Sequence, residues 1–417
     1  MTAARTNWAR NITFAAPGFC SPATLGELRA VVARARQVRV LGTGHSFNDM
    51  ADSPGTQVSL AGLPPEVEID SADSLVRVSA GLPYSVLAAR LDRQGFALRT
   101  MASLPHISVA GATATGTHGS GTANQSLSAA VTGLELVTAG GDVVELDGDA
   151  VAGAVVHLGA LGVVTRLILA VVPSYEVAQR VYEDLPLDVL DDHFADIMAS
   201  GYSVSMFTDW RAPRLTQVWI KSLTEDGTPP VTEEPWFTAT SAPVTRHPVP
   251  GLPAENATAQ LGEPGPWFER LPHFQPEFTP SAGAELQTEY LLPAAHAVPA
   301  LHVLRQASDR IAPVLQICEI RTVAADGLWL SPAYRQDSVA FHFTWRPDTA
   351  AVLPVVSLLE RQLAPFTPRP HWAKIFTISA ADLHERYERL PSFLDLARHY
   401  NPAGKFRNAY TARCLGR

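Results

Sequence analysis

The N-terminal part of the chain alternates helical and extended patterns of apolar residues. Residues 23–34 carry apolar side chains at the three- and four-residue spacing of an amphipathic helix. These apolar positions are Leu25, Leu28, Val31 and Val32. A short run rich in valine follows at residues 38–41 and leads into Gly42-Thr43-Gly44. This order predicts a helix, then a strand, then a sharp glycine turn.

Two pairs of alternating segments in the same region predict β-hairpins. In the first, residues 67–69 and 76–78 place apolar side chains at every second position around a polar turn. In the second, residues 134–137 and 143–146 flank a Gly-Gly-Asp turn. A helical pattern at residues 83–93 lies between the two hairpins. Because strands and helices are mixed rather than strictly alternating, the pattern favours an α+β fold over a doubly wound parallel sheet.

The character of the sequence changes after Pro173. Proline and aromatic residues cluster between residues 229 and 280, which predicts a long irregular segment because proline cannot pair within a central strand. Two further predicted strands and two predicted helices follow, near Glu319, Phe341, residues 350–363 and residues 381–396. We therefore expect a first domain of residues 1–172 and a second domain that begins at residue 173.

Composition and charge restrict the classes of function. Of the 417 residues 46% are hydrophobic and 18% are charged, and 32 basic against 41 acidic side chains give a net charge of −9. These values indicate a globular protein rather than a disordered one. No basic run suggests a nucleic-acid partner, and no window approaches the roughly 20 apolar residues of a membrane span. With no signal-peptide core at the N-terminus, we expect a monomeric cytoplasmic protein.

Cysteine content argues against a structural metal or a disulfide framework. The three cysteines, Cys20, Cys318 and Cys414, are few and far apart in the sequence. No other combination of residues indicates a metal site, so we expect none.

Two segments of small residues are candidates for binding a large ligand through their backbone. Residues 41–48 contain two glycines spaced by one residue, which lets backbone N–H groups approach an anion such as a pyrophosphate. Between residues 108 and 122, only Val109 and His118 are larger than threonine. Such a segment suits close approach of the backbone to a large ligand. A glycine turn with an exposed histidine and a flexible loop are the alternative interpretations.

Two predicted strands carry polar faces. Period-2 geometry puts Glu319 and Arg321 on one face, and His342 and Thr344 on the face opposite three aromatic residues. One interpretation is a solvated outer face of an antiparallel sheet. The other is a polar cavity, which Lys374 could join, although a lysine flanked by aromatic residues is usually at the surface.

Three motifs of the first 121 residues resemble the FAD domain of the vanillyl-alcohol-oxidase family. They are Gly-Thr-Gly-His-Ser-Phe-Asn at 42–48, Met-Ala-Ser-Leu-Pro-His-Ile-Ser-Val-Ala-Gly at 101–111, and Thr-Gly-Thr-His-Gly-Ser-Gly at 115–121. Residues 158–165 resemble the closing strand of that domain. Within the family, Glu-Ile-Arg-Thr at 319–322, His-Phe-Thr at 342–344 and His-Trp-Ala-Lys at 371–374 are similar to the alditol oxidases. The likeness covers nearly the whole chain.

The resemblance implies the fold and the cofactor. The expected fold has two domains: an FAD-binding domain (1–172) and an α+β substrate domain (173–375) with an antiparallel sheet flanked by helices, followed by a segment (376–417) that returns to the FAD domain. FAD would be attached covalently through His45. The implied FAD contacts are Leu41, Gly42, Thr43, Gly44, His45, Ser46, Phe47, Ser103, Ser108, Gly111, Thr115, Gly116, Thr117, His118, Gly162, Val163 and Val164.

The resemblance also implies the reaction and its residues. The terminal hydroxyl of an alditol such as xylitol or sorbitol would be oxidised to the aldose, with O₂ reduced to hydrogen peroxide. His342 would be the base, and Lys374 would stabilise developing charge. The implied substrate contacts are Ser103, Glu319, Arg321, Thr344 and Lys374. Alternatives are an aldonolactone oxidase or dehydrogenase of the same family, a sugar-binding protein without catalysis, and, least favoured, a hydrolase using Ser120.

Overall fold

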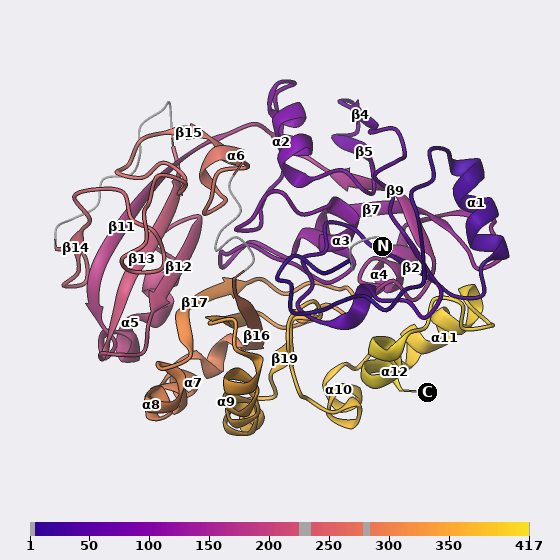
Figure 1. Cartoon of the computed structure of the whole chain (residues 1–417). Helices are drawn as coiled ribbons and strands as arrows, with labels where there is room; N and C mark the ends of the chain where they lie inside the picture. Colours follow the sequence, from indigo (N-terminus) through magenta and orange to yellow (C-terminus); the bar gives the residue numbers. More distant parts are fainter. Residues whose placement is uncertain (1–4, 225–234, 278–283, 417) are drawn as a thin grey trace.

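A computed structural model describes residues 5–224, 235–277 and 284–416 of the chain. Two groups of β-sheets lie side by side in it (Figure 1). Strands up to residue 173 form a five-stranded, a three-stranded and a two-stranded sheet, whereas the strands from residue 176 onward form one nine-stranded sheet. The mixture of helices and antiparallel sheets confirms the predicted α+β fold class.

The N-terminal sheets contain both predicted hairpins. The five-stranded sheet has the antiparallel order β4-β5-β9-β7-β8, and the three-stranded sheet has the parallel order β1-β3-β2. The elements of this region are β1 (Gly18–Cys20), α1 (Leu25–Arg34), β2 (Val38–Val40), η1 (Asp49–Ala51), β3 (Thr56–Val58), β4 (Val67–Asp70), β5 (Leu75–Ser79), α2 (Tyr84–Asp92), β6 (Phe96–Ala97), α3 (Val109–Thr113), η2 (Leu127–Ala130), β7 (Val131–Val137), β8 (Val143–Asp147), α4 (Asp149–Ala154), β9 (Val163–Ala170) and β10 (Val172–Pro173).

Local sequence explains the predicted helix at the N-terminus. The Thr24 side chain accepts a hydrogen bond from the backbone N–H of Glu27 and so caps α1. Leu28 and Val32, one turn apart, are fully buried against the sheets. The same amphipathic spacing that predicted the helix therefore also fixes which face it buries.

The nine-stranded sheet is the framework of the second half. Its order is β14-β11-β13-β12-β17-β18-β16-β19, with β15 paired to β11. The elements are β11 (Glu176–Pro186), α5 (Val189–Met198), β12 (Ser203–Thr208), β13 (Arg214–Leu223), β14 (Thr240–Ser241), β15 (Gly265–Pro266), α6 (Trp267–Arg270), β16 (Leu286–Pro293), η4 (Ala294–His296), α7 (Ala297–Gln306), α8 (Ser308–Ile311), β17 (Leu315–Val323), β18 (Ser338–Trp345), α9 (Thr349–Leu363), η5 (Ala364–Phe366) and β19 (Arg369–Pro370).

One face of this sheet is covered by helices α5, α7, α8 and α9 (Figure 1). Phe341, Phe343 and Trp345 of β18 are fully buried in that apolar layer, together with Cys318 and Ile320 of β17. The predicted face assignment of both strands is thereby confirmed. The polar positions of the same strands point to the opposite side of the sheet.

The proline- and aromatic-rich segment is mostly irregular where the structure describes it, with only β14, β15 and α6 as short elements. Residues 229–234 and 278–280 of the predicted segment lie outside the described residues. Its buried side chains include Trp267, His273 and Phe274. The segment therefore contributes side chains, His273 among them, to the interior of the protein.

The last helices return to the N-terminal sheets. They are α10 (Ala380–Arg386), α11 (Leu390–Tyr400) and α12 (Ala409–Leu415). The backbone N–H of Val38 donates to the Lys405 carbonyl at 3.0 Å, and the buried Arg39 guanidinium donates to the Phe406 carbonyl at 3.0 Å. The C-terminal segment is thus hydrogen-bonded to the strand that precedes the first glycine loop.

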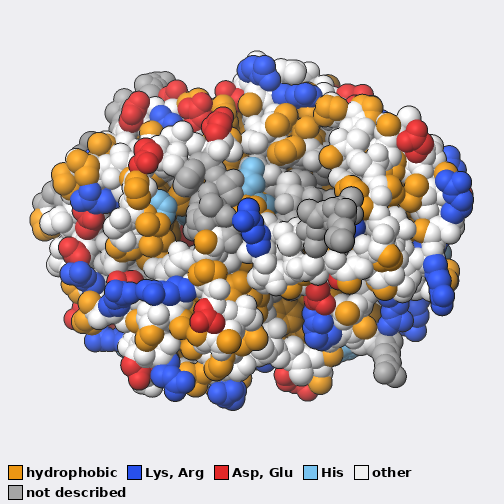
Figure 2. Space-filling view, viewed as in Figure 1, with side chains coloured by type: hydrophobic (Ala, Val, Ile, Leu, Met, Phe, Trp, Pro, Cys, Tyr) orange, Lys and Arg blue, Asp and Glu red, His pale blue; other side chains and the backbone are white. Residues whose placement is uncertain are grey.

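Neither a membrane-crossing helix nor a metal-binding cluster occurs in the described part of the chain. No helix there combines the length and apolarity needed to span a bilayer. No group of three or more His, Cys, Asp or Glu side chains there is arranged to hold a metal ion. On the face shown in Figure 2, acidic and basic side chains are interspersed.

Candidate active site

A cavity of about 610 Å³ lies between the glycine loops of the N-terminal region and the polar face of the nine-stranded sheet. Most of the predicted site residues line it. They are Leu41, Gly42, Thr43, Gly44, His45, Ser46, Phe47, Ser103, Ser108, Gly111, Thr115, Thr117, His118, Gly162, Val164, Glu319, Arg321, His342, Thr344 and Lys374. Two groups of residues that lie far apart in the sequence therefore face one cavity.

The first glycine loop exposes backbone donors to this cavity. Gly44 has a φ of +74°, a left-handed conformation that favours glycine. Its carbonyl accepts from the Trp8 N–H at 2.8 Å, and the Phe47 N–H donates to the Ala373 carbonyl at 2.7 Å, which anchors the loop at both ends. The N–H groups of residues 42–46 have no hydrogen-bond acceptor among the described residues. They fit an anionic ligand such as the pyrophosphate of the predicted FAD.

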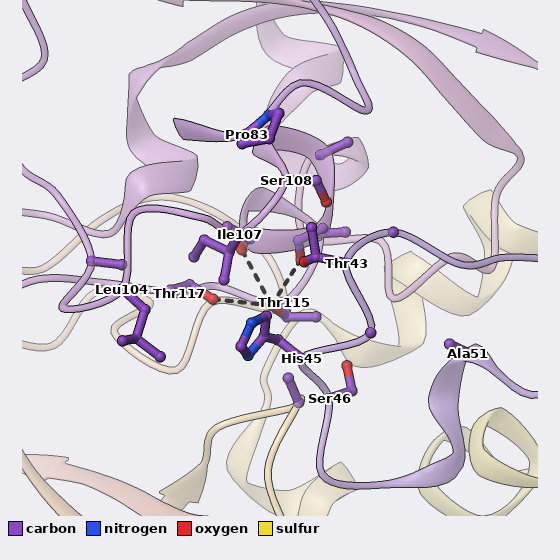
Figure 3. Close-up of a pocket in the computed structure, with 18 of the residues that line it drawn as sticks. Thr43, His45, Ser46, Ala51, Pro83, Leu104, Ile107, Ser108, Thr115 and Thr117 are labelled. Atoms are coloured by element: carbon purple, nitrogen blue, oxygen red, sulfur yellow. Dashed lines mark hydrogen bonds between the residues drawn. The ribbon is translucent and has the colours of Figure 1, made fainter. Parts of the chain in front are cut away.

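The second small-residue segment lies against the first. A β-carbon on Gly42 would lie 2.7 Å from the Ser108 hydroxyl oxygen, so glycine at this position lets the two loops approach. Figure 3 shows Ser108, Thr115 and Thr117 around the same cavity as Thr43 and His45. The Thr115 hydroxyl donates to the Gly111 carbonyl at 3.1 Å, which fixes its rotamer.

Two of the predicted FAD contacts do not line the cavity. Val163 is fully buried in the apolar core, because side chains alternate along β9 and its neighbours Gly162 and Val164 occupy the cavity side. Gly116, at a φ of +68°, approaches Pro332 instead: a β-carbon there would lie 2.9 Å from Pro332 Cδ. Contacts between these two residues and FAD therefore remain predictions.

His45 projects from the first loop into a mostly buried environment. Its Nε2 lies 2.5 Å from Nε2 of His106, and its ring lies 4.7 Å from the Trp8 ring. Burial, with a smaller contribution from His106, lowers the pKa of His45 to about 3. The imidazole is therefore neutral at neutral pH, with one ring nitrogen free to act as a nucleophile. His106 belongs to the motif at residues 101–111, but no pattern in the sequence indicates that it contacts His45.

The polar face of β17 and β18 is buried. Glu319 and His342 are directly opposite each other in the ladder, so their side chains share a face with those of Arg321 and Thr344. Glu319 is 4% exposed and Arg321 is 5% exposed. The interpretation as a solvated outer face is wrong, because the N-terminal loops and His273 cover this side of the sheet.

An unpredicted carboxylate, Glu289 of β16, organises the cations of the site. It accepts from Arg321 at 2.5 Å and from Lys374 at 2.7 Å, and it lies 3.3 Å from His118 Nε2. Burial alone would raise the pKa of Glu289, but Lys374, Arg321 and His118 hold it well below its usual value. Its signal in the sequence was the alternation of polar Glu285, Gln287 and Glu289 with apolar neighbours.

Lys374 is mostly buried, which decides against the surface interpretation. Burial, partly offset by Glu289, lowers the pKa of Lys374. Ser103 lies at the edge of the same group, where its hydroxyl accepts from Arg321 Nη1 at 3.5 Å. The site therefore combines two carboxylates, a guanidinium, an ammonium and hydroxyl groups within one cavity wall.

His342 has the geometry of a proton acceptor. Its Nδ1 lies 3.4 Å from Glu319 Oε2, and its buried Nε2 has no hydrogen-bond partner among the described residues. Burial and then Lys374 lower its pKa to about 4, against the opposing effect of Glu319. A neutral imidazole with an unpaired nitrogen at a cavity wall can accept a proton from a bound hydroxyl group.

Buried neutral histidines make stability depend on pH. Burial lowers the pKa of both His157 and His273 to about 4. Because the unfolded chain binds these protons near pH 6.5, stability is complete above that pH and is lost as pH falls towards 4, by roughly 3 kcal/mol for each histidine. We expect the unfolding temperature to fall over this range, and to fall less steeply in His157→Asn. The exposed His302→Gln serves as the control. A His157→Asn slope equal to that of the wild type would contradict the assignment.

Comparison with known proteins identifies two family models along the chain. Residues 16–147 match an FAD binding domain, and residues 284–414 match the D-arabinono-1,4-lactone oxidase model. The chain is 54% identical to an alditol oxidase from Streptomyces sp. over 98% of both proteins. It is 29% identical to the L-gulono-1,4-lactone dehydrogenase of Mycobacterium tuberculosis over 98% of both, and 26% identical to the mouse L-gulonolactone oxidase over 97% of this chain and 96% of that protein.

Solved structures support the same fold. A solvent-stable cholesterol oxidase superposes with a TM-score of 0.79 at 15% identity and covers 99% of this chain and 97% of that chain. The cholesterol oxidase from B. sterolicum gives a TM-score of 0.79 at 12% identity and covers 99% of this chain and 96% of its own. At these identities the likeness concerns the fold alone.

Proposed function

We propose that this chain, which belongs to the vanillyl-alcohol-oxidase-type flavoprotein family together with the Streptomyces alditol oxidase, oxidises the terminal hydroxyl of alditols with FAD as its cofactor. The observation that supports this most strongly is the single cavity between the glycine loops and the buried polar face of β16, β17 and β18. The loops fit the cofactor, and the polar face fits a row of hydroxyl groups.

An acyclic polyol needs a donor or an acceptor for each hydroxyl group once it leaves water. Glu319 supplies acceptors, Arg321 supplies donors, and Ser103 and Thr344 supply groups that do either. On this face of β17 and β18 the side chains that line the cavity are charged or polar apart from Ile317. This supports a small, hydroxyl-rich substrate.

Proton removal is assigned to His342. Its unpaired Nε2 accepts the hydroxyl proton while Nδ1 stays bonded to Glu319. Lys374, held by Glu289, supplies a fixed positive charge beside the oxygen on which negative charge develops. The glycine loops at residues 42–46 and 108–117 would hold FAD, which would supply the hydride acceptor and the route by which two electrons reach O₂ to give hydrogen peroxide.

We propose further that FAD is attached covalently through His45, by a bond between an imidazole nitrogen and the 8α-carbon of the flavin. The neutral imidazole would provide the nucleophilic nitrogen, and His106, 2.5 Å away, is placed to accept the proton that His45 loses. The 8α-carbon would lose a C–H proton, and the two electrons left on the flavin would pass to O₂, the oxidant of the proposed reaction. The three-part division into residues 1–172, 173–375 and 376–417, the monomeric state and the cytoplasmic location remain predictions from the sequence.

Acid precipitation tests the attachment site. In the wild type we expect yellow flavin to stay in the pellet, whereas His45→Ala should release all of it to the supernatant. His106→Leu should still bind FAD but attach it more slowly, measured as the acid-stable fraction over time after FAD is added to apoprotein. Acid-stable flavin in His45→Ala would show that another residue is the attachment point.

Substrate turnover tests the reaction itself. The purified protein is assayed with xylitol, sorbitol and L-gulono-1,4-lactone, and hydrogen peroxide is measured alongside the product. We expect the two alditols to give an aldose and peroxide in equal amounts. Turnover of the lactone without turnover of the alditols would instead favour the aldonolactone oxidase or dehydrogenase alternative.

A further inference from the structure

A buried lysine lies behind the polar face and has no part in the mechanism above. Lys221, near the end of β13, is 1% exposed. Its Nζ donates to the Leu271 carbonyl, to the Pro272 carbonyl at 3.0 Å and to Nδ1 of His273 at 3.2 Å. Three acceptors match the three N–H bonds of an ammonium group. Within the described residues, no carboxylate lies within salt-bridge distance of it.

His273 connects this lysine to the site. Because Lys221 donates to Nδ1, the hydrogen of the neutral ring lies on Nε2, which donates to Glu319 Oε1 at 2.7 Å. The ring is held edge-on by Trp219 at 5.1 Å and by Phe207 at 5.7 Å. Its tautomer and its orientation are thus both fixed by buried neighbours.

Glu319 in turn fixes the tautomer of His342, the proposed base. With Oε1 of Glu319 occupied by His273, the other oxygen, Oε2, faces Nδ1 of His342 at 3.4 Å. A carboxylate at that position favours the tautomer with hydrogen on Nδ1. This leaves Nε2 of His342 unprotonated at the cavity wall, as proton acceptance requires.

We propose that Lys221 and His273 are positioning residues, which hold Glu319 so that His342 presents an unprotonated Nε2 to the substrate hydroxyl. This proposal rests on the proposed function, and specifically on His342 as the base. It assigns a role to two residues that do not remove the proton themselves.

The charges around the chain of contacts support this role. Glu319 faces His273, His342 and Arg321, whose Nε lies 3.7 Å away. Burial alone would raise the pKa of Glu319, but Arg321 and His273 hold it well below its usual value, so it remains a carboxylate. Burial lowers the pKa of Lys221 to about 7.

His342 also responds to Lys374, Glu289 and Arg321, which lie on the neighbouring elements. Lys221 holds His273, and His273 donates to Glu319, so loss of either one leaves Glu319 freer to stabilise a protonated His342. We therefore expect both changes to raise the pKa of His342. When either Lys221 or His273 is replaced, the rate of flavin reduction should therefore begin to fall at a higher pH as the solution is made more acidic.

The test compares His273→Leu, His273→Gln and Lys221→Met in anaerobic flavin reduction at saturating xylitol between pH 4 and pH 9. The glutamine variant keeps one acceptor for Lys221 and one donor for Glu319. We expect His273→Leu and Lys221→Met to be slower by about 10- to 100-fold, a range typical when the hydrogen-bond partner of an active-site group is removed. In these two variants the rate should begin to fall at a higher pH on the acid side of the profile. His273→Gln should stay near the wild type in both its rate and the pH at which that rate falls.

A second comparison separates positioning from structural damage. In a His342→Ala background, His273→Leu should have little further effect, because it acts through His342. A wild-type rate and acid limb in His273→Leu, or an equal loss in both backgrounds, would overturn the proposal. Unfolding temperature and flavin content identify variants that fail to fold. If Lys221→Met does not fold, the comparison of His273→Leu with His273→Gln tests the proposal. Failure of the proposed function would show separately, as a wild-type flavin that xylitol does not reduce.

Discussion

Replacing His342 by alanine is expected to slow anaerobic flavin reduction by xylitol about 10²–10⁴-fold, the usual contribution of a general base. Because the base acts only as the transition state forms, kcat and kcat/KM should fall together. In the wild type the rate should decline as pH falls towards 4, since burial lowers the pKa of His342 to about that value and protonation removes the acceptor.

Stopped-flow bleaching of the oxidised flavin measures this rate, with the exposed His302→Ala as the matched control. Lys374→Met should also slow reduction, and the two changes should be far less than additive if both residues act on one proton and hydride transfer. Wild-type reduction rates in His342→Ala would contradict the base assignment and would leave Lys374 as the next candidate.

Replacing Arg321 by alanine is expected to weaken use of long alditols severely. Arg321 is 2.5 Å from Glu289 and 3.7 Å from Glu319, so its loss removes one cationic partner from each of two buried carboxylates as well as donors to the substrate. Truncation of a buried charge pair costs about 2–5 kcal/mol, which corresponds to roughly 30-fold to a few thousand-fold in kcat/KM. Most of this loss in kcat/KM should appear as a higher KM.

Substrate length provides the internal comparison for this variant. A short diol makes fewer contacts along Glu319 and Arg321, so its kcat/KM should fall less than that of sorbitol. The exposed Arg211→Ala controls for loss of an arginine elsewhere. Unchanged sorbitol kinetics in Arg321→Ala would mean that the substrate does not contact this part of the cavity wall.

Period-2 alternation predicted the faces of β17 and β18 correctly, because successive side chains of a strand point to opposite faces of the sheet. It could not say whether the polar face meets solvent or another part of the protein. That depends on the glycine loops, which lie far earlier in the chain, and on His273 from the irregular segment. The resemblance in the motifs, rather than the alternation, pointed to the cavity.

The residues that the sequence did not predict are those whose role depends on a neighbour far along the chain. Glu289 matters because it pairs with both Arg321 and Lys374, and Lys221 matters because it contacts His273. His106 lies beside His45 only once the two loops pack together. Val163 adjoins Gly162 in a motif, but alternation along β9 directs its side chain into the core, which a motif alone does not indicate.

Anaerobic mixing of the purified flavoprotein with xylitol, and with xylitol carrying deuterium on its terminal carbons, tests the central claim most directly. We expect xylitol to bleach the flavin, the deuterated compound to do so more slowly because the terminal C–H bond breaks in the step observed, and admission of O₂ to restore the colour with release of hydrogen peroxide. A flavin that xylitol leaves oxidised while L-gulono-1,4-lactone bleaches it would contradict the assignment of this cavity to alditols.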